Sequence, residues 1–184
     1  MKTILIFIVL LLSAVNSKQE DDGIVSWDEN QPLTWNDFKG LPQKTKAGAY
    51  TGCGILRSVA KSTGNTASVK IQAVFFCQQS WKKKKDAGAS ALMHEQKHFD
   101  IAECYARKLR KAIRIQKYHS MAELRRKTDS LYTIIDKEVI SYQQHYDNQA
   151  NYGRASKQRH WNIKIKAFLD SLSEYSAPVF IIGF

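Results

Sequence analysis

The most constraining stretch of the chain is Leu92–Ala106, which reads LMHEQKHFDIAECYA. His94 and His98 are four residues apart, so on an α-helix their imidazoles share one face, about 40° and one turn apart. Both rings can then bind one metal ion, and Glu95 directly follows the first histidine. The pattern His-Glu-x-x-His is typical of helices that supply two zinc ligands and a general base. The competing interpretation is an exposed helix face that carries two ordinary histidines.

These residue types suit zinc chemistry. Neutral imidazole is a good ligand for Zn²⁺, and the ion lowers the pKa of a bound water to about 7. A neighbouring carboxylate can then accept the proton and later pass it to a leaving amine. The motif therefore predicts a Zn²⁺ cofactor bound by His94 and His98, with Glu95 as the catalytic base.

The residues around the motif favour a long helix, from about residue 86 to about residue 114. Alanines, Leu92 and Met93 are good helix formers, and the chain has no proline between Pro42 and Pro178. Asp86 is the candidate N-cap of this helix. The helical context favours the metal motif over the interpretation of two ordinary histidines.

The first residues have the pattern of an export signal. A short basic start is followed by an unbroken apolar run, Ile4–Leu12, and then by small residues that include Val15 and Ser17. The run is shorter than the roughly 20 apolar residues that span a bilayer. We therefore expect residues 1–17 to be a signal peptide and residues 18–184 to be a single secreted or periplasmic domain, without a transmembrane segment in the mature form.

The chain is strongly basic, with 28 Lys and Arg against 17 Asp and Glu and a formal charge of +11. Nucleic-acid binding is one interpretation, but export argues against it and no nucleic-acid-binding motif accompanies the charge. A solvated basic surface, in electrostatic contact with an anionic envelope, is the favoured interpretation. The predicted partner is a peptide or protein substrate, and we expect a monomer.

Hydrophobic periodicity predicts an α+β fold. Residues 67–77 alternate between apolar and polar positions, and with residues 47–60 they form an antiparallel hairpin around the turn at Ser62–Asn65. Ser120 and Glu123 form a capping box that starts a second helix, from about residue 121 to His145. A third helix covers about 154–172. The apolar residues 179–184 are expected to pack on the domain or to pair with a strand. The prediction is a small antiparallel β-sheet packed on the motif helix, with two further helices.

A catalytic zinc needs a third protein ligand. Glu103 lies about 140° around the helix from His98, so it faces away and is better suited to a salt bridge. Glu138 on the second helix is an alternative. Asp147 lies in the turn that is predicted to end that helix.

Three cysteines remain in a chain that is expected to be exported. Cys53 and Cys77 fall in neighbouring predicted strands, and we expect them to form a disulfide. Cys104 is then left as a free thiol on the motif helix.

Several stretches together resemble a secreted bacterial family, domain of unknown function 922, whose members are described as zinc-dependent proteases. The resemblance covers nearly the whole chain after residue 17 and implies a zincin-like fold and peptidase activity. The matching stretches are Leu33–Gly40, Ser80–Trp81, His94–Glu103 with Ala106–Arg110, and Tyr146–Gly153 with Gln158 and Trp161.

Members of this family often carry a histidine before the glycine that matches Gly153, where this chain has Tyr152. If that histidine is the third ligand, this chain has lost it. If it stabilises an oxyanion, Tyr152 can still donate a hydrogen bond, since a phenol is neutral below about pH 10. His145 is the alternative for this role.

The arrangement also resembles peptidases whose third ligand is an aspartate shortly before a Tyr-Gly pair, which favours Asp147. The resemblance thus implies a secreted zinc metallopeptidase. The alternatives are an inactive binding module with the same fold, and a metal-dependent hydrolase of an envelope component.

Overall fold

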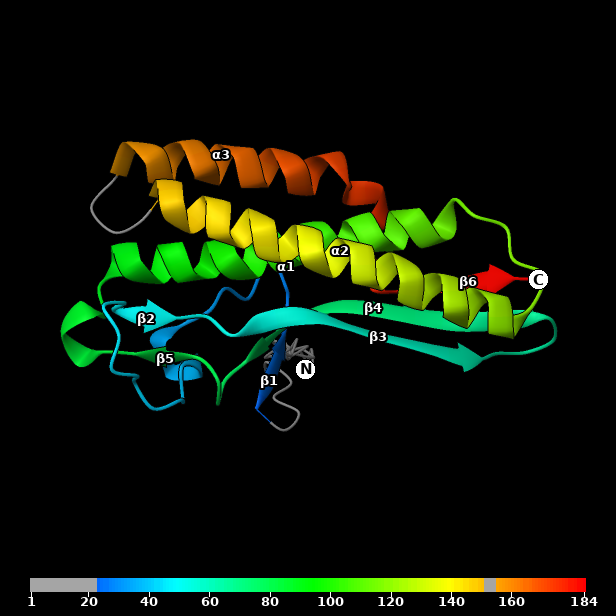
Figure 1. The fold of residues 1–184 in the computed structure, drawn as a ribbon, viewed down its shortest axis with the longest axis horizontal. Helices are drawn as coiled ribbons and strands as arrows, with labels where there is room; N and C mark the ends of the chain where they lie inside the picture. Colours follow the sequence, from blue (N-terminus) through cyan, green and yellow to red (C-terminus); the bar gives the residue numbers. More distant parts are fainter. Residues whose placement is uncertain (1–22, 151–154) are drawn as a thin grey trace, which may run out of the picture.

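The computed structural model describes residues 23–150 and 155–184. The predicted signal peptide, Tyr152 and Gly153 lie outside the described residues. Within them the chain has a mixed α+β architecture of three α-helices and small antiparallel sheets (Figure 1). None of the described helices is both long and apolar enough to cross a membrane.

The larger sheet is built around one long strand, β4 (Thr66–Phe76). β3 (Cys53–Lys61) pairs along one edge of β4 and forms the predicted hairpin with it. The other edge is shared by β1 (Ile24–Ser26) near the end of β4 and by β6 (Val179–Gly183) near its beginning. A second, two-stranded sheet joins β2 (Ala49–Tyr50) to β5 (Trp81–Lys82). The apolar C-terminal segment thus pairs with a strand, as predicted.

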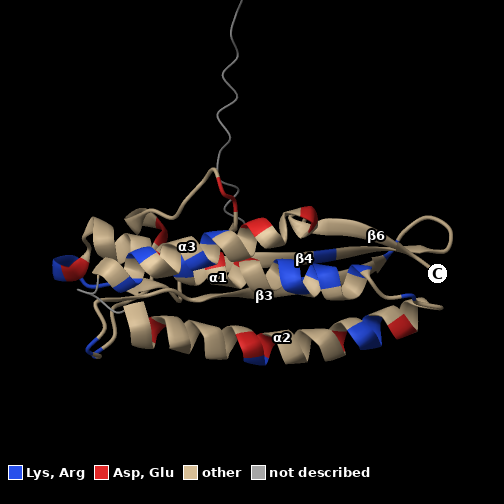
Figure 2. Cartoon of the chain, turned by 90° about the horizontal axis from the view of Figure 1, so that it is seen from above, with Lys and Arg blue, Asp and Glu red and all other residues tan. Residues whose placement is uncertain are grey.

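The helix that carries the histidine motif, α1 (Ala89–Arg114), is the centre of the packing. It contacts β3 and β4 of the sheet and also the two other helices, α2 (Met121–Ala150) and α3 (Ala155–Ser171) (Figure 1). Three short 3₁₀ helices complete the described elements: η1 (Trp35–Asp37), η2 (Lys84–Asp86) and η3 (Ser173–Tyr175). Figure 2 shows that basic and acidic positions are interspersed along α2, whereas in α1 most of the basic positions follow the acidic ones, from Arg107 to Arg114.

The core lies between the sheet and α1, and the alternation of β4 places it there. The inward side chains of β4 are fully buried, as the alternating pattern predicted. They pack on α1 through apolar residues such as Phe99, whose ring lies 5.9 Å from that of Phe75. The buried residues of this strand face are Ala67, Val69, Ile71, Ala73 and Phe75.

The first helix begins later than predicted, and Asp86 is not its N-cap. Asp86 belongs to η2, and Gly88 is the N-cap of α1 without a side-chain cap. The reason is the second sheet: the backbone N–H of Lys83 donates to the Gly48 carbonyl at 2.7 Å, and Asp86 packs against Gly48. This contact holds the aspartate away from the helix terminus.

The second helix begins as predicted but continues to Ala150, beyond the expected end at His145. Its start is capped because Ser120 Oγ accepts from the backbone N–H of Glu123 at 3.2 Å, and Glu123 accepts from the N–H of His119 at 2.8 Å. The last turns persist because Tyr146 and Ala150 are buried in the core. Asp147 consequently lies within the helix and not in a turn after it.

The predicted disulfide between Cys53 and Cys77 is wrong, since all three cysteines are free thiols. Cys53 faces Phe75 in the β3–β4 register, so Cys77 is displaced from it by two residues. Such diagonal neighbours are about 7–8 Å apart, whereas a disulfide needs Cβ atoms within about 4.5 Å. Cys53 Sγ instead lies 3.5 Å from the backbone oxygen of His98. Cys104 is free and buried, as expected.

Candidate metal centre

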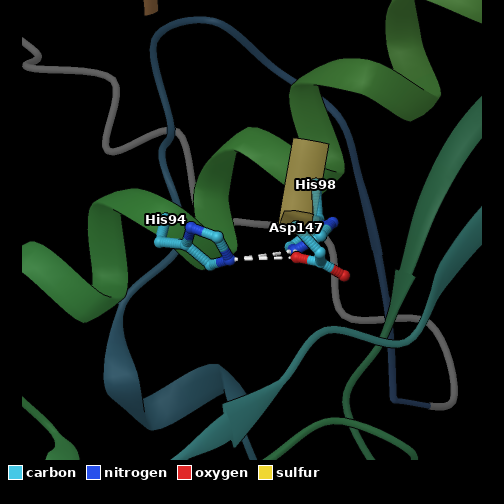
Figure 3. Close-up of side chains that lie close together, drawn as sticks. All are labelled: His94, His98 and Asp147. Atoms are coloured by element: carbon cyan, nitrogen blue, oxygen red, sulfur yellow. Dashed lines mark hydrogen bonds and ion pairs between the residues drawn. The ribbon is translucent and has the colours of Figure 1, made fainter. Parts of the chain in front are cut away.

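His94 and His98 of α1 meet Asp147 of α2 at one point (Figure 3). Asp147 Oδ1 lies 3.2 Å from His94 Nε2 and 2.9 Å from His98 Nε2. The two Nε2 atoms are 3.3 Å apart. One ligand atom from each residue lies within 4.8 Å of the others, so the three residues could hold a metal ion. The structure thus brings together the three side chains that the sequence selected as metal ligands.

The far side of each imidazole contacts a glutamine. Gln143 Nε2 donates to the backbone oxygen of His98 at 2.8 Å, which fixes the amide so that its Oε1 faces His98 Nδ1. Gln158 Oε1 lies 3.2 Å from His94 Nδ1 and also accepts from the hydroxyl of Tyr146 at 2.9 Å. An amide oxygen can only accept hydrogen bonds, so each Nδ1 is the donor. The lone pair of each neutral ring is therefore on Nε2, which faces Asp147.

This arrangement fits a bound cation. Two Nε2 lone pairs and one carboxylate oxygen face one another, and a cation among them satisfies all three acceptors. Imidazole nitrogen and carboxylate oxygen are ligands that zinc uses in catalytic sites, and hydrogen bonds from Nδ1 are the usual way to orient metal-binding histidines. Tyr146 adds to the orientation, because its ring stacks on that of His94 at 4.7 Å.

Protonation takes the place of a cation in the metal-free protein. Burial lowers the pKa of His98, but the hydrogen bond to Asp147 and the charges of Asp147 and Glu95 outweigh it, so the pKa is raised above 6.5. Burial raises the pKa of Asp147, but hydrogen bonds from His94 and His98 hold it far below its usual range. The two shifts together favour an ionised Asp147 carboxylate beside a positively charged His98 imidazole.

Glu95 lies in the same cavity as the three candidate ligands. This cavity has a volume of about 530 Å³ and is lined by His94, Glu95, His98 and Asp147 together with residues of β2, β3 and α2. Glu95 is buried, and Thr51 Oγ1 donates to its Oε2 at 2.7 Å. Thr51 follows β2 directly, so the small sheet positions the carboxylate of the predicted base.

The alternative site residues lie elsewhere. Glu103 forms salt bridges with Arg107 and Arg110, which agrees with the expectation that it faces away from the metal. Glu138 pairs with Lys108, and the exposed His145 lies against the Trp161 ring at 5.5 Å. None of these three lines the cavity. Tyr152 lies outside the described residues.

The sequence did not reveal Thr51, Gln143 or the contact from Gln158 to His94. Gln143 and Asp147 are four residues apart, so they share a helix face, but this signal appears only once Asp147 is placed inside α2. Thr51 and Gln158 reach the motif across 44 and 64 residues of sequence, respectively, and no local pattern identifies such contacts.

No protein-family model, curated protein or solved structure matches this chain. The resemblance to a zinc-dependent protease family therefore stays a prediction from the sequence. The chemistry of the cluster has to be argued from its own residues.

Proposed function

We propose that the protein is a secreted zinc-dependent metallopeptidase with a zincin-like fold. The observation that carries the proposal is the convergence of His94, His98 and Asp147, with both Nδ1 atoms held by glutamine oxygens and with Glu95 in the same cavity. His94, His98 and Asp147 would hold the ion. When bound, Zn²⁺ would activate a water molecule and polarise the scissile carbonyl group.

Glu95 is the proton carrier of this mechanism. Its carboxylate accepts a proton from the attacking water as the water oxygen bonds to the carbonyl carbon of the substrate. It then gives this proton to the amine nitrogen when the C–N bond breaks, so that the products are a carboxylate and an amine. The hydrogen bond from Thr51 to Oε2 fixes the orientation of the carboxylate for both transfers.

Two further elements of the proposal come from the sequence. Tyr152, through its neutral phenol, is the proposed donor to the oxyanion that forms during attack. Residues 1–17 are the proposed signal peptide, which places the substrate outside the cytoplasm.

The proposal is tested by peptide cleavage with purified protein of residues 18–184. Zinc-loaded protein is expected to cleave members of a peptide library, and Glu95→Gln is expected to lower the rate by about 10²–10⁴-fold because it removes the general base. Equal cleavage by the variant would contradict the proposed mechanism.

Metal content provides the second test. We expect one zinc per chain at neutral pH, and none in His94→Ala or Asp147→Ala. Glu138→Ala is the matched control, because this carboxylate pairs with Lys108 outside the cavity. Bound zinc without any cleavage would favour the alternative of an inactive binding module.

A further inference from the structure

A second cavity adjoins the metal cavity. It has a volume of about 710 Å³, within the usual range for ligand sites, and it shares Ala47 and Tyr50 with the metal cavity. Its remaining lining includes Leu41, Trp81 and polar uncharged residues. The two cavities therefore meet along one wall, which we call the wall segment and define as residues 47–53.

The wall segment connects both cavities to the proposed catalytic groups. Thr51 donates to Glu95, and Cys53 lies against the backbone of His98, so one side of the segment belongs to the metal centre. The neighbouring Tyr50 is 52% exposed, and its ring stacks on that of Trp81 at 6.3 Å in the second cavity. The N–H of Gly52 donates to the buried Ser80 Oγ at 2.9 Å, which fixes the segment between the two cavities.

The second cavity is uncharged although the chain is strongly basic. Among the described residues that line it, none is Lys, Arg, Asp or Glu; they are Leu41, Gln43, Thr45, Ala47, Tyr50, Gln78, Gln79 and Trp81. Two neighbouring lysines lie close without lining it. Lys82 Nζ donates to the Trp35 carbonyl in η1. Lys83 Nζ donates to the Thr45 carbonyl and lies 5.9 Å from the centre of the Trp81 ring, so its ammonium group is bound at the edge of the cavity.

The rim of the two cavities exposes apolar surface that a ligand can cover. Leu41 is 88% exposed and Ile140, on the metal side, is 51% exposed. Burial of such surface by an apolar ligand is favourable, because it removes apolar area from water. The amides of Gln43, Gln78 and Gln79 can hydrogen-bond a peptide backbone without selecting for charge.

We propose that the second cavity binds a large uncharged side chain, aromatic or long aliphatic, of a peptide substrate whose backbone continues into the metal cavity. This inference rests on the proposed peptidase function. It adds the substrate class: peptides with such a side chain at one fixed position near the scissile bond.

Binding to an inactive variant tests the inference without cleavage. Capped pentapeptides that differ at one position, with Phe, Leu, Lys or Asp, are titrated into zinc-loaded Glu95→Gln, and each position is varied in turn. At one position Phe and Leu are expected to bind about tenfold more tightly than Lys and Asp, as is usual for an apolar pocket. Equal affinities at every position would overturn the inference.

Tyr50→Lys sharpens this test because it places a positive charge at the junction of the cavities. It is expected to weaken Phe-peptide binding about tenfold and to reverse the order of the Phe and Asp peptides. Leu56→Lys is the matched control: Leu56 is 46% exposed on β3, lines neither cavity, and should change neither affinity. Tyr50→Ala removes the apolar contact without adding a charge, and it should also weaken binding of the Phe peptide. Unchanged binding in both Tyr50 variants would overturn the inference.

Failure of the proposed function gives a different result. In that case the wild-type protein cleaves nothing, or cleaves as well as Glu95→Gln, while peptide preference in the binding experiment still reports on the second cavity. Cleavage that depends on Glu95 but shows no preference for uncharged side chains would overturn the inference alone.

Discussion

Two polar clusters are built on residues of the same helix, α1, and their hydrogen bonds are completed in opposite ways: the Glu103 cluster is buried, whereas the metal cluster includes the exposed Asp147 of α2. In the cluster around Glu103, the carboxylate accepts from Arg107 at 2.9 Å and from Arg110 at 2.8 and 3.1 Å. Arg110 also donates to the backbone oxygens of Ile71, Tyr175 and Ser176, so donors and acceptors match within the protein. In the metal cluster, three acceptors face one another.

The difference separates a structural cluster from a ligand site. The Glu103 cluster joins α1 to the sheet and to the segment after α3, and it needs no external group. The metal cluster has its donors on the outside, at the two Nδ1 atoms, and its lone pairs on the inside. The comparison teaches that the direction of the hydrogen-bond donors distinguishes a charged cluster that is complete within the fold from one that could hold an ion.

The largest effect is expected from Arg110→Ala in the structural cluster. Removal of the guanidinium leaves the buried Glu103 with Arg107 as its remaining ion-pair partner. Loss of one partner of a buried ion pair lowers the free energy of unfolding by about 3–5 kcal/mol. Urea unfolding in the presence of a chelator measures this loss. In a separate measurement without chelator, the folded variant should still bind zinc. Loss of zinc binding at low urea, where the variant is folded, would show that the two clusters are not independent.

Gln143→Leu in the metal cluster is expected to have an intermediate effect. It removes the acceptor for His98 Nδ1–H, and loss of such an orienting partner typically weakens metal binding about 10–100-fold, or roughly 1.4–2.7 kcal/mol. A competition titration with a zinc chelator measures the affinity. Gln144→Leu is the control, because Gln144 lines the same cavity while the two Nδ1 atoms contact Gln158 and Gln143 instead.

The pH dependence of stability should change sign when zinc is added. The pKa of His98 is raised in the metal-free fold, so protonated His98 stabilises the folded state. This contribution to the free energy of unfolding is fully present below the unfolded pKa near 6.5, and it is lost as pH rises through the folded pKa. Zinc requires neutral imidazoles, so zinc-loaded protein gains stability over the same rise. Asp147 stays ionised throughout, since its pKa is held low.

Melting temperatures are measured from about pH 6 to pH 8, once with chelator and once with zinc. The slope of melting temperature against pH is expected to be negative with chelator and positive with zinc. Parallel slopes would contradict the metal site.

The smallest effect is expected at an exposed ion pair outside both clusters. Lys166 contacts Asp170 at 2.7 Å, but the two side chains are 70% and 61% exposed. Solvent screens such pairs, and Lys166→Met should change the free energy of unfolding by less than about 1 kcal/mol. A change as large as that of Arg110→Ala would remove the distinction between buried and exposed charge on which the comparison depends.

Local pattern predicted most of the architecture. The alternation along β4, the capping box at Ser120 and the apolar C-terminal strand each depend on neighbouring residues, and each was found where the sequence placed it. Asp86 and the end of α2 were misplaced because tertiary contacts override local preference. Gly48 holds Asp86 away from the helix, and burial of Tyr146 and Ala150 extends α2 through residues of low helix propensity.

In the candidate site, the sequence predicted the proposed ligands and the proposed base but not the residues that orient them. His94, Glu95 and His98 form a local motif, and Asp147 was selected through a family resemblance. Gln158 was part of the family resemblance, but its contact with His94 was not predicted, and Gln143 could be selected only once Asp147 is placed inside α2. The cysteine pairing failed because neighbouring strands do not determine register, and a shift of two residues separates Cys53 from Cys77.

The position of β6 has a consequence for the order in which the sheet can form during synthesis. Residues 66–70 of β4 pair on this edge with residues 179–183, so more than a hundred residues must be added before the edge is covered. Until then β4 offers free backbone groups to any extended chain, and an uncovered strand edge is a template for aggregation. This edge of β4 therefore stays uncovered until residues 179–183 are available to pair with it.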